Sequence, residues 1–460
     1  MKKFITAIIA AAMILSAEAQ WVSPGNGTTY TFDNLSSVSN GAVVKTSDGN
    51  FNVVEDITIS AGDFLNFDAT LETVTFNDGI QLTIAGGVTS ADRLDKALLT
   101  GGNGHFKVKF DASSETNVVK NINFQNGGGI RVSETPSIIF ENCEFGYFNK
   151  SFTSYALLYF NCSPVVESCY FHDNQGAAIG SGANIFGAPK IYNSYFYNNV
   201  TENSNNPQLN LGPCSNGDTI KIIGNTIEGL NGTMVGGIAI ANLMNVGNTK
   251  AQIFNNNVFN NRYGYTQTGP TIESWIYDNL FIDNNLETNP MNGGSGISIY
   301  GTATTNIATL RRNIITGNLW GITAIYYHNI DMGTVDDFGE NVIYNNGNGG
   351  VTYALYNNAF SDMTAIGNYW GSNDPAFAAE VIYDHSDDPS LGTVTYLPIM
   401  EMYPIGDANS DGEVNVQDIQ AIISYMLDGT GINFDSADAN SDGYVNILDI
   451  VLIVNIIENF

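Results

Sequence analysis

Positive charge is scarce in this sequence. Its 460 residues include 16 Lys and Arg against 46 Asp and Glu, which gives a formal net charge of −30 at pH 7. We therefore exclude nucleic acid as a partner, because contacts with phosphates need clustered cations. The acidic excess instead fits a calcium-rich environment, where carboxylates find counterions.

Cysteine is also sparse, with four residues in the whole chain, at positions 143, 162, 169 and 214. No Cys-x-x-Cys pair occurs, so metal binding by these residues is not expected. Cys143 and Cys169 occupy matching positions in the repeat described below, and we expect them to be neighbours. The sequence leaves open whether they are two thiols or a disulfide.

Long apolar runs are absent beyond the N-terminus. Residues 1–19 have the pattern of a secretory signal, with two lysines, an apolar stretch over 5–15 and a small-x-small cleavage site over 17–19. We expect the mature chain to begin at Gln20. No later run is long and apolar enough to span a bilayer. The sequence thus predicts a secreted protein, either extracellular or tethered at the cell surface, with no membrane span.

What the chain does contain is a repeat. The segment 253–259, Ile-Phe-Asn-Asn-Asn-Val-Phe, recurs in varied form, and the last apolar residue of each copy serves as an anchor. Nine intervals separate ten anchors, with a mean of about 27 residues, the range of solenoids, propellers and arrays. The anchors are Phe124, Phe145, Phe171, Phe196, Ile227, Phe259, Phe281, Ile315, Ile343 and Trp370.

The residue two positions before each anchor favours a parallel β-helix. Coils of such a solenoid stack at ~4.8 Å, so like residues form ladders, and stacked amides hydrogen-bond along them. A propeller would need four strands per roughly 40–45 residues, and regular apolar anchors argue against disorder. Small polar residues dominate the position, which is Asn at Asn225, Asn257, Asn279, Asn313, Asn341 and Asn368.

Each coil also contains a second strand, which usually opens with glycine, as at 237–240 and 296–300. Its Ile and Val residues alternate with other residues, so we expect the former to face the lumen and the latter to face outward. Residues 20 to about 115 are read as the first coils plus a cap, because a bare end would expose sheet edges. The predicted outer residues are Arg131, Ala239, Ser298, Thr323 and Thr352.

The rhythm stops after Trp370, and the segments 367–372 and 382–388 read as a closing end. With this end, the region 20–400 resembles the pectate-lyase-like right-handed parallel β-helix superfamily. The resemblance implies an all-β solenoid and specifies fold better than function. We predict this β-helix over 20–400, followed by a short linker over 401–405 and a small α-helical module over 406–460.

Two twelve-residue acidic loops lie in the last 55 residues. When each loop is compared together with the residue that follows it, ten of the thirteen positions are identical. Calcium takes six to eight oxygen ligands at ~2.3–2.6 Å, and the spacing offers side-chain oxygens at positions 1, 3, 5, 9 and 12 and a carbonyl at 7. We predict two Ca²⁺ ions. The ligands are Asp407, Asn409, Asp411, Glu413, Asn415 and Asp418 in one loop and Asp438, Asn440, Asp442, Tyr444, Asn446 and Asp449 in the other.

These loops differ from ordinary EF-hands, because Pro404 and Gly406 prevent an entering helix. A helix is predicted after each loop from its apolar face. Together these features closely resemble the type I dockerin module, which implies a cohesin-like module on a scaffold protein as partner. Positions 10 and 11 are Val416-Gln417 and Ile447-Leu448 rather than the Ser-Thr pair of many members, so the partner type stays open. The pair 447–448 could belong to the interface or to the helix core.

The sequence does not decide whether the β-helix is an enzyme. Lyases and hydrolases of this superfamily use carboxylates and basic residues on the outer face of one long sheet, and no carboxylate cluster appears there. Weak catalytic candidates lie in loops: Arg262, His328 and Asp331. Tyr263, Tyr265, Trp320, Tyr326 and Tyr327 could stack on sugars. We expect a carbohydrate-binding or polysaccharide-processing protein, the alternative being a non-catalytic structural or adhesive one.

Overall fold

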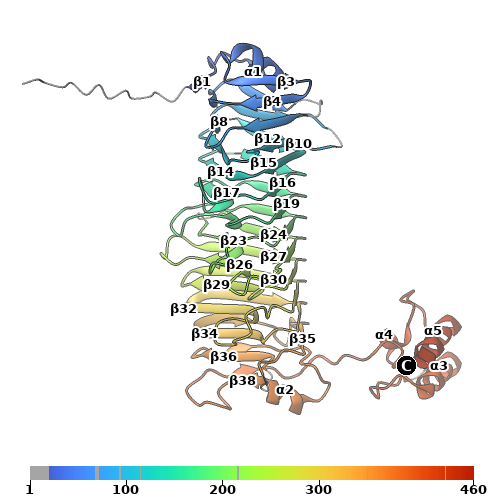
Figure 1. Ribbon diagram of the computed structural model, residues 1–460. Helices are drawn as coiled ribbons and strands as arrows, with labels where there is room; N and C mark the ends of the chain where they lie inside the picture. The colour runs from blue at the N-terminus through green and yellow to red at the C-terminus, as the bar shows by residue number, and fades with distance from the viewer. Residues whose placement is uncertain are drawn as a thin grey trace, which may run out of the picture.

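The computed structural model describes residues 20–67, 72–92, 95–113, 115–135, 137–214, 217–349, 351, 353–429 and 431–459. The predicted signal segment 1–19 lies outside these residues. Most of the described chain winds into a right-handed parallel β-helix, which confirms the predicted fold class (Figure 1). Each coil contributes strands to three faces, which we name sheets 1, 2 and 3.

Sheet 1 is the longest face, and its strands pair in parallel from the first coils to the last. It consists of β1 (Gln20–Val22), β5 (Asp56–Ile59), β8 (Gln81–Ile84), β11 (Phe106–Asp111), β14 (Gly127–Ser133), β17 (Tyr155–Phe160), β20 (Ala177–Gly180), β23 (Pro207–Leu211), β26 (Gly236–Ala241), β29 (Tyr265–Gly269), β32 (Ser295–Arg311), β34 (Trp320–Asp331), β36 (Leu355–Ala359) and β38 (Ile382–Tyr383).

Sheet 2 is joined to sheet 1 by β32 and β34, which are long enough to serve both faces, so the two form one 23-stranded network. Its other strands are β12 (Thr116–Lys120), β15 (Ser137–Glu141), β18 (Val165–Glu167), β21 (Lys190–Tyr192), β24 (Ile220–Ile223), β27 (Thr249–Phe254), β30 (Ile272–Tyr277), β37 (Met363–Thr364) and β39 (Val394–Thr395).

Sheet 3 contains 13 strands, parallel except for the first pair. They are β3 (Val43–Ser47), β4 (Asn50–Val53), β7 (Thr73–Phe76), β10 (Ala97–Thr100), β13 (Ile122–Gln125), β16 (Glu144–Gly146), β19 (Tyr170–His172), β22 (Tyr195–Tyr197), β25 (Thr226–Glu228), β28 (Asn257–Phe259), β31 (Leu280–Ile282), β33 (Ile314–Thr316) and β35 (Val342–Tyr344). The three strands β2 (Thr29–Tyr30), β6 (Phe64–Phe67) and β9 (Gly87–Ser90) form a separate small sheet.

The lumen is filled by the inward-facing apolar side chains of the strands, such as Ile238 and Ile240 of β26, and these stack into rows. Ile238 of β26, Tyr265 of β29, Ile297 of β32 and Ile322 of β34 are paired in register and fully buried. The alternation predicted for sheet 1 is thus confirmed. Burial of about 25 cal/mol per Å² of apolar surface makes this continuous core the main source of stability.

One strand of sheet 1 was misplaced by the sequence pattern. We expected a strand over 350–353 with Thr352 facing outward, but β36 begins at Leu355, and Thr352 lies outside the described residues. Val351 is 47% exposed, whereas Leu355 is fully buried and pairs with Ile322. The apolar residue that fills the lumen therefore sets the register, and the outward residue of this coil is Tyr356.

A ladder of buried polar side chains runs along one corner of the β-helix. Each asparagine Oδ1 accepts a bond from the backbone N–H of the previous rung and, where that rung is also an asparagine, from its Nδ2; the distance from Asn225 N to Asn256 Oδ1, for example, is 2.9 Å. The rungs are Cys143, Cys169, Ser194, Asn225, Asn256, Asn279, Asn313, Asn341 and Asn368.

The ladder corrects one predicted residue. The rung is Asn256, which is fully buried, and not Asn257, which is exposed. The coil carries three consecutive asparagines, and the alignment took Phe259 as anchor where Val258 is the buried residue that pairs with Phe281. A shift of one residue moves every side chain to the opposite face of a strand.

The cysteines at the start of the ladder are thiols. All four cysteines are free and buried, and Cys169 Sγ accepts a hydrogen bond from the backbone N–H of Cys143 at 3.4 Å. Burial raises the pKa of the Cys169 thiol well above its usual value. The two sulfurs therefore act as rungs of the ladder, which answers the question that the sequence left open.

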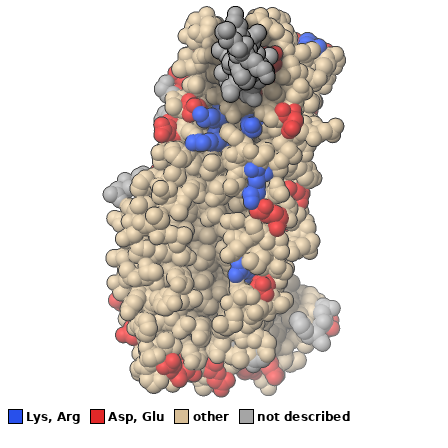
Figure 2. All heavy atoms as spheres, turned by 60° about the vertical axis from the view of Figure 1, so that its left-hand side comes forward, with Lys and Arg blue, Asp and Glu red and all other residues tan. Residues whose placement is uncertain are grey.

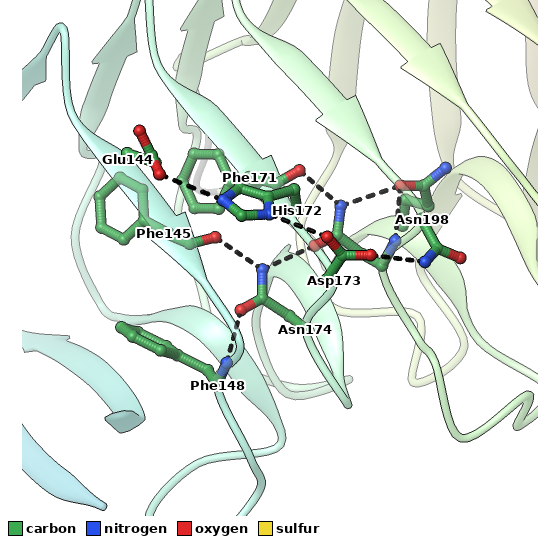
Figure 3. Close-up of polar contacts among 10 residues, drawn as sticks. Glu144, Phe145, Phe148, Phe171, His172, Asp173, Asn174 and Asn198 are labelled. Atoms are coloured by element: carbon green, nitrogen blue, oxygen red, sulfur yellow. Dashed lines mark hydrogen bonds and ion pairs between the residues drawn. The ribbon is translucent and has the colours of Figure 1, made fainter. Parts of the chain in front are cut away.

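A second ladder, which the sequence pattern did not reveal, lies five residues after the first. In Figure 3, Asn174 accepts a bond from Phe148 N–H at 3.0 Å and donates to Phe145 O at 2.9 Å. The corresponding residue of the coil after Asn199 is the exposed Leu230. Gln208 of β23 fills that gap, because its amide bonds both Asn199 and Asn261. The rungs are Asn174, Asn199, Gln208, Asn261, Asn284, Asn318 and Asn346.

The two ends of the solenoid are closed differently. At the N-terminal end, α1 (Phe32–Val38) buries Phe32 and Leu35, and Asp63 accepts bonds from the N–H groups of residues 25–28 at 2.8–3.0 Å. At the C-terminal end, α2 (Pro375–Val381) covers the last coil, and the buried Asp384 orders the closing segment through Ser386 and Val394. Both caps shield edges that would otherwise pair with other chains.

The C-terminal helices form a core of their own. α3 (Val416–Asp428), α4 (Phe434–Ala437) and α5 (Ile447–Asn459) surround the buried residues Ala408, Ile422, Ala437 and Ile453. This small cluster is distinct from the core of the β-helix.

Candidate functional site

The first acidic loop, residues 407–418, is folded by its own carboxylates. Asp407 accepts bonds from the N–H groups of Asp411 at 3.1 Å and Gly412 at 2.8 Å. Asp418 accepts from Asn409 N–H at 3.1 Å and Asn415 N–H at 2.8 Å. The first and last acids of the loop therefore hold the intervening chain in a closed turn.

The second loop, residues 438–449, repeats this arrangement. Asp438 accepts from Asp442 N–H at 3.1 Å and Gly443 N–H at 2.8 Å, and Asp449 accepts from Asn440 N–H at 3.2 Å and Asn446 N–H at 2.8 Å. The sixth position has φ of +89° in the first loop and +84° in the second, a conformation that glycine adopts without strain.

The predicted carbonyl ligands lie within the same turns. Glu413 N–H donates to Asp411 Oδ1 at 3.0 Å, and Tyr444 N–H donates to Asp442 Oδ1 at 2.9 Å. Tyr444 O accepts from Asn446 Nδ2 at 3.3 Å, so this carbonyl is directed toward a predicted ligand. The Tyr444 side chain is 73% exposed, which leaves only its backbone available to the loop.

The charge of this region calls for a bound cation. Residues 406–460 contain ten Asp and Glu and no Lys, Arg or His. Asp407, Asp418 and Asp449 are nevertheless fully buried, and a buried carboxylate is costly without a compensating charge. Hard oxygen donors in this number suit Ca²⁺. Among the described residues no three His, Cys, Asp or Glu side chains are grouped so that they could hold a metal ion by themselves.

A helix follows each loop and is fixed by the last residues of the loop. Asn415 and Asp418 form a capping box at the start of α3, with Asn415 accepting from Gln417 N–H at 2.8 Å. Val416, Ile447 and Leu448 are 58%, 58% and 57% exposed. Of the two readings of the pair 447–448, the structure thus excludes the helix core and leaves a surface position.

A groove of about 340 Å³ lies on the outer face of sheet 1 in the C-terminal half of the β-helix. Its floor follows one row of paired residues: Thr266 of β29, Ser298 of β32, Thr323 of β34 and Tyr356 of β36. None of the residues that line it is charged. Figure 2 shows the molecule from this side: a broad uncharged region lies below a group of charged residues and beside a column of Lys, Arg, Asp and Glu, and acidic residues lie along the lower end.

Aromatic rings gather at one end of the groove. Trp320 stacks on Tyr353 with ring centroids 5.2 Å apart and an interplanar angle of 6°, and lies 4.9 Å from Tyr356. Tyr383 of the next coil continues the cluster, 5.0 Å from Tyr356. Sequence reasoning named Trp320 but missed Tyr356 and Tyr383, because the register of the last coils was set incorrectly.

One wall of the groove is a loop formed by residues 290–293, and two side chains hold it. Arg262 donates from Nε to Asn292 O at 2.7 Å, and from Nη1 to Asn205 Oδ1 at 2.5 Å. Trp320 donates its indole N–H to Pro290 O at 2.9 Å. Arg262, a predicted catalytic candidate, therefore positions the wall and has its guanidinium occupied by protein acceptors.

The other two catalytic candidates are not brought together. His328 is 1% exposed, and burial lowers its pKa to about 4 even though Asn357 opposes the shift, so the imidazole is neutral. Asp331 accepts from Arg311 Nη2 at 2.9 Å, and Arg311 also binds Asp337 at 2.8 Å. Both carboxylates are thus engaged in an ion-pair network. The three candidates occupy separate environments and do not form an acid–base pair as placed.

Comparisons with known proteins give a family match at the C-terminal end of the chain. Residues 405–458 match the Dockerin type I domain family, a class of calcium-binding modules that dock onto cohesins. A comparison with curated protein sequences gives no match. No described helix has the length and apolar character needed to cross a membrane.

Among solved structures, the chain is similar to crystal structures of mutants of the periplasmic alginate epimerase AlgG. One has 12% identity, a TM-score of 0.49 and coverage of 81% of this chain and 84% of the other; another has 14% identity, a TM-score of 0.47 and coverage of 80% and 83%. The similarity is remote, and the β-helix assignment rests on the strand pairing described above.

Proposed function

We propose that this protein is a secreted β-helix that handles polysaccharide and is tethered through residues 406–460 to a cohesin-like module on a scaffold protein. The observation that carries the tethering is the pair of identically folded acidic loops in a region without a cationic side chain. The family match supports the same assignment. Residues 401–405 would serve as the linker, and residues 1–19 as the signal for export.

Each loop would hold one Ca²⁺ ion through its six predicted ligands. The ion would supply the charge that balances the three aspartates of the loop, and the loop would fix the start of the following helix. The helices α3 and α5 present exposed apolar residues, including Met426 and Leu427 on α3 and Val451 on α5. Calcium would thereby order the surface that a cohesin-like partner contacts.

Calorimetry and pull-down test this proposal. In calorimetry, we expect the full chain to bind two Ca²⁺ ions. In the pull-down, a panel of immobilised cohesin modules of different types is tested, and we expect at least one of them to capture the chain in calcium but not in chelator. Asp407→Ala with Asp438→Ala should abolish both. Asp435→Asn, which removes a carboxylate of α4 outside both loops, should change neither. Capture that persists in chelator, or calcium binding that survives the double substitution, would contradict the proposal.

The β-helix is better suited to binding sugar than to cleaving it in the groove. Hydrolysis needs two carboxyl groups ~5–10 Å apart, and elimination beside a uronate needs a base and a neutralised carboxylate. The residues that line the groove supply neither. We therefore propose binding without catalysis at this face. Release of reducing ends or unsaturated sugars that depends on Thr323 or Tyr356 would refute this part.

A further inference from the structure

We propose that the groove on sheet 1 binds an uncharged polysaccharide, with the sugar chain lying along the axis of the solenoid. This inference rests on the proposed function, because it assigns the ligand class of the polysaccharide-handling β-helix. It is carried by four features of the groove: its lack of charge, its hydroxyl row, its aromatic end and its braced wall.

The lack of charge selects the class of sugar. The lining residues include hydroxyls, amides and aromatic rings, and no Lys, Arg, Asp or Glu. A polyuronate would bring one carboxylate per sugar into a site without a cation, on a protein with a net charge of −30. Each carboxylate would lose water without gaining an ionic partner. A neutral chain meets neither the repulsion nor the desolvation cost.

The hydroxyl row matches the form of a polymer. Thr266, Ser298 and Thr323 lie on successive coils in register, and Ser295 Oγ lies 3.1 Å from Thr323 Oγ1. Successive coils are ~4.8 Å apart, close to the length of one sugar residue in an extended glycan. A chain along the axis would therefore meet an equivalent polar side chain at each sugar, and hydroxyls both donate and accept hydrogen bonds.

The aromatic end supplies apolar surface for the faces of the sugar rings. Trp320 and Tyr356 line the groove and are partly exposed. The indole is fixed by its bond to Pro290 and by the stack on Tyr353, so little conformational freedom remains to be lost on binding. From Thr266 to Tyr383 the row spans four coil intervals, roughly 19 Å at ~4.8 Å each, which accommodates about four sugars.

The loop 290–293 forms one side of the groove and is held in place by Arg262. Arg262 lies beside the groove, and its bonds to Asn205 and Asn292 make it the brace of the wall. Gly293 packs against the Arg262 side chain so closely that an added Cβ would lie 2.7 Å from Arg262 Cγ. The wall is therefore held in place by contacts within the protein, so binding of a ligand does not carry the entropic cost of ordering this loop.

Affinity electrophoresis of the full chain in calcium tests the proposal. Native gels would contain a neutral glucan, mannan, xylan or galactan, or a polygalacturonate or alginate of similar length. We expect at least one neutral polymer to retard the protein and neither polyuronate to do so. Trp320→Ala and Tyr356→Ala should each weaken the affinity about tenfold or more. Thr323→Val, which keeps the shape and removes the hydroxyl, should weaken it about threefold to tenfold.

Matched controls separate binding from folding and from tethering. Tyr147→Ala removes a 51% exposed tyrosine beside sheet 3 and should leave retardation unchanged. The double variant Asp407→Ala, Asp438→Ala should lose cohesin capture but keep retardation, so failure of the docking proposal and failure of this one are distinguishable. The inference is overturned if no neutral polymer retards the chain, if a polyuronate retards it more strongly, or if the groove variants, with unchanged circular dichroism, bind like the wild type.

Discussion

The asparagine ladder offers a sharp test of what holds the coils together, because Asn256 and Asn257 are adjacent and face opposite ways. Asn256 Oδ1 accepts from Asn225 N–H and from Asn225 Nδ2, while Asn256 Nδ2 donates to Ile222 O at 2.8 Å and Asn279 Oδ1 at 2.9 Å. Leucine at 256 would remove all four bonds while keeping a similar volume.

The magnitude follows from the groups left behind. Asn225 N–H and Ile222 C=O lose these partners inside the protein, at about 1–3 kcal/mol each, or about 2–6 kcal/mol together. Burial of the leucine returns about 2 kcal/mol. We therefore expect Asn256→Leu to lower the free energy of unfolding by about 2 kcal/mol, and at most about 4 kcal/mol, although it adds apolar surface to the core.

Urea unfolding of the full chain in saturating calcium, followed by circular dichroism of the β-sheet signal, measures this difference. Asn257→Leu is the matched control, because an exposed position away from such contacts changes stability by within about 0.5 kcal/mol. The reasoning is refuted if Asn256→Leu is as stable as the wild type, or if the two variants are destabilised equally.

Three further predictions address the second ladder, the N-terminal cap and the calcium loops. Gln208→Leu should lower the unfolding free energy by about 1–3 kcal/mol in the same urea assay, since the buried Asn199 and Asn261 side chains each lose their bond to Gln208; a neutral effect would contradict its bridging role. Burial raises the pKa of Asp63, but hydrogen bonds from Ser23 and from backbone N–H groups outweigh this effect and leave the pKa below its usual value. The ionised Asp63 therefore stabilises the cap at pH values above its unfolded pKa of ~3.9. This stabilisation is lost as the pH falls through the lower pKa of the folded state. Asp63→Asn should therefore increase amide exchange over residues 25–28 at pH 7, and its effect should shrink as acid protonates Asp63; an effect that is the same at every pH would refute the account. Asp411→Ala should remove one of two calcium-binding events in calorimetry, and loss of both would show that the loops are not independent.

The fold was largely predictable from the sequence because the same pattern of residues recurs in every coil of a solenoid. The buried anchor, the asparagine and the lumen residues recur in coil after coil, so an error in one copy does not alter the class. Register within a single coil was less secure. Three consecutive asparagines at 255–257 offer no contrast by which to choose the buried one, and the neighbouring apolar pair Val258 and Phe259 are both plausible anchors.

The candidate sites were predictable to different degrees. The calcium loops are local in sequence, since twelve consecutive residues provide all the donors of one turn. The groove is not local: its floor takes one residue from each of several coils, separated by 25 to 33 positions, as Ser298, Thr323 and Tyr356 show. The second ladder was hidden for a related reason, because Gln208 comes from a different strand of its coil and replaces a residue that the repeat lacks.

The first ladder also has a direction. Along the asparagine run, the backbone N–H and one Nδ2 hydrogen of each rung bond to the rung that follows in the chain, from Asn225 to Asn256 and onward to Asn368. If the coils fold in chain order, the asparagine Oδ1 of each new coil accepts its bonds as soon as the coil stacks on the previous one. Its backbone N–H and one Nδ2 hydrogen stay without a ladder partner until the next coil has folded. We therefore expect the coils to fold in order from the N-terminal end to the C-terminal end, each on the surface of the coil before it. Truncation from the C-terminal end should leave the backbone N–H and one Nδ2 hydrogen of the last asparagine without their ladder partner, whereas truncation from the N-terminal end should leave the Oδ1 acceptor and the other Nδ2 hydrogen of the first one without theirs.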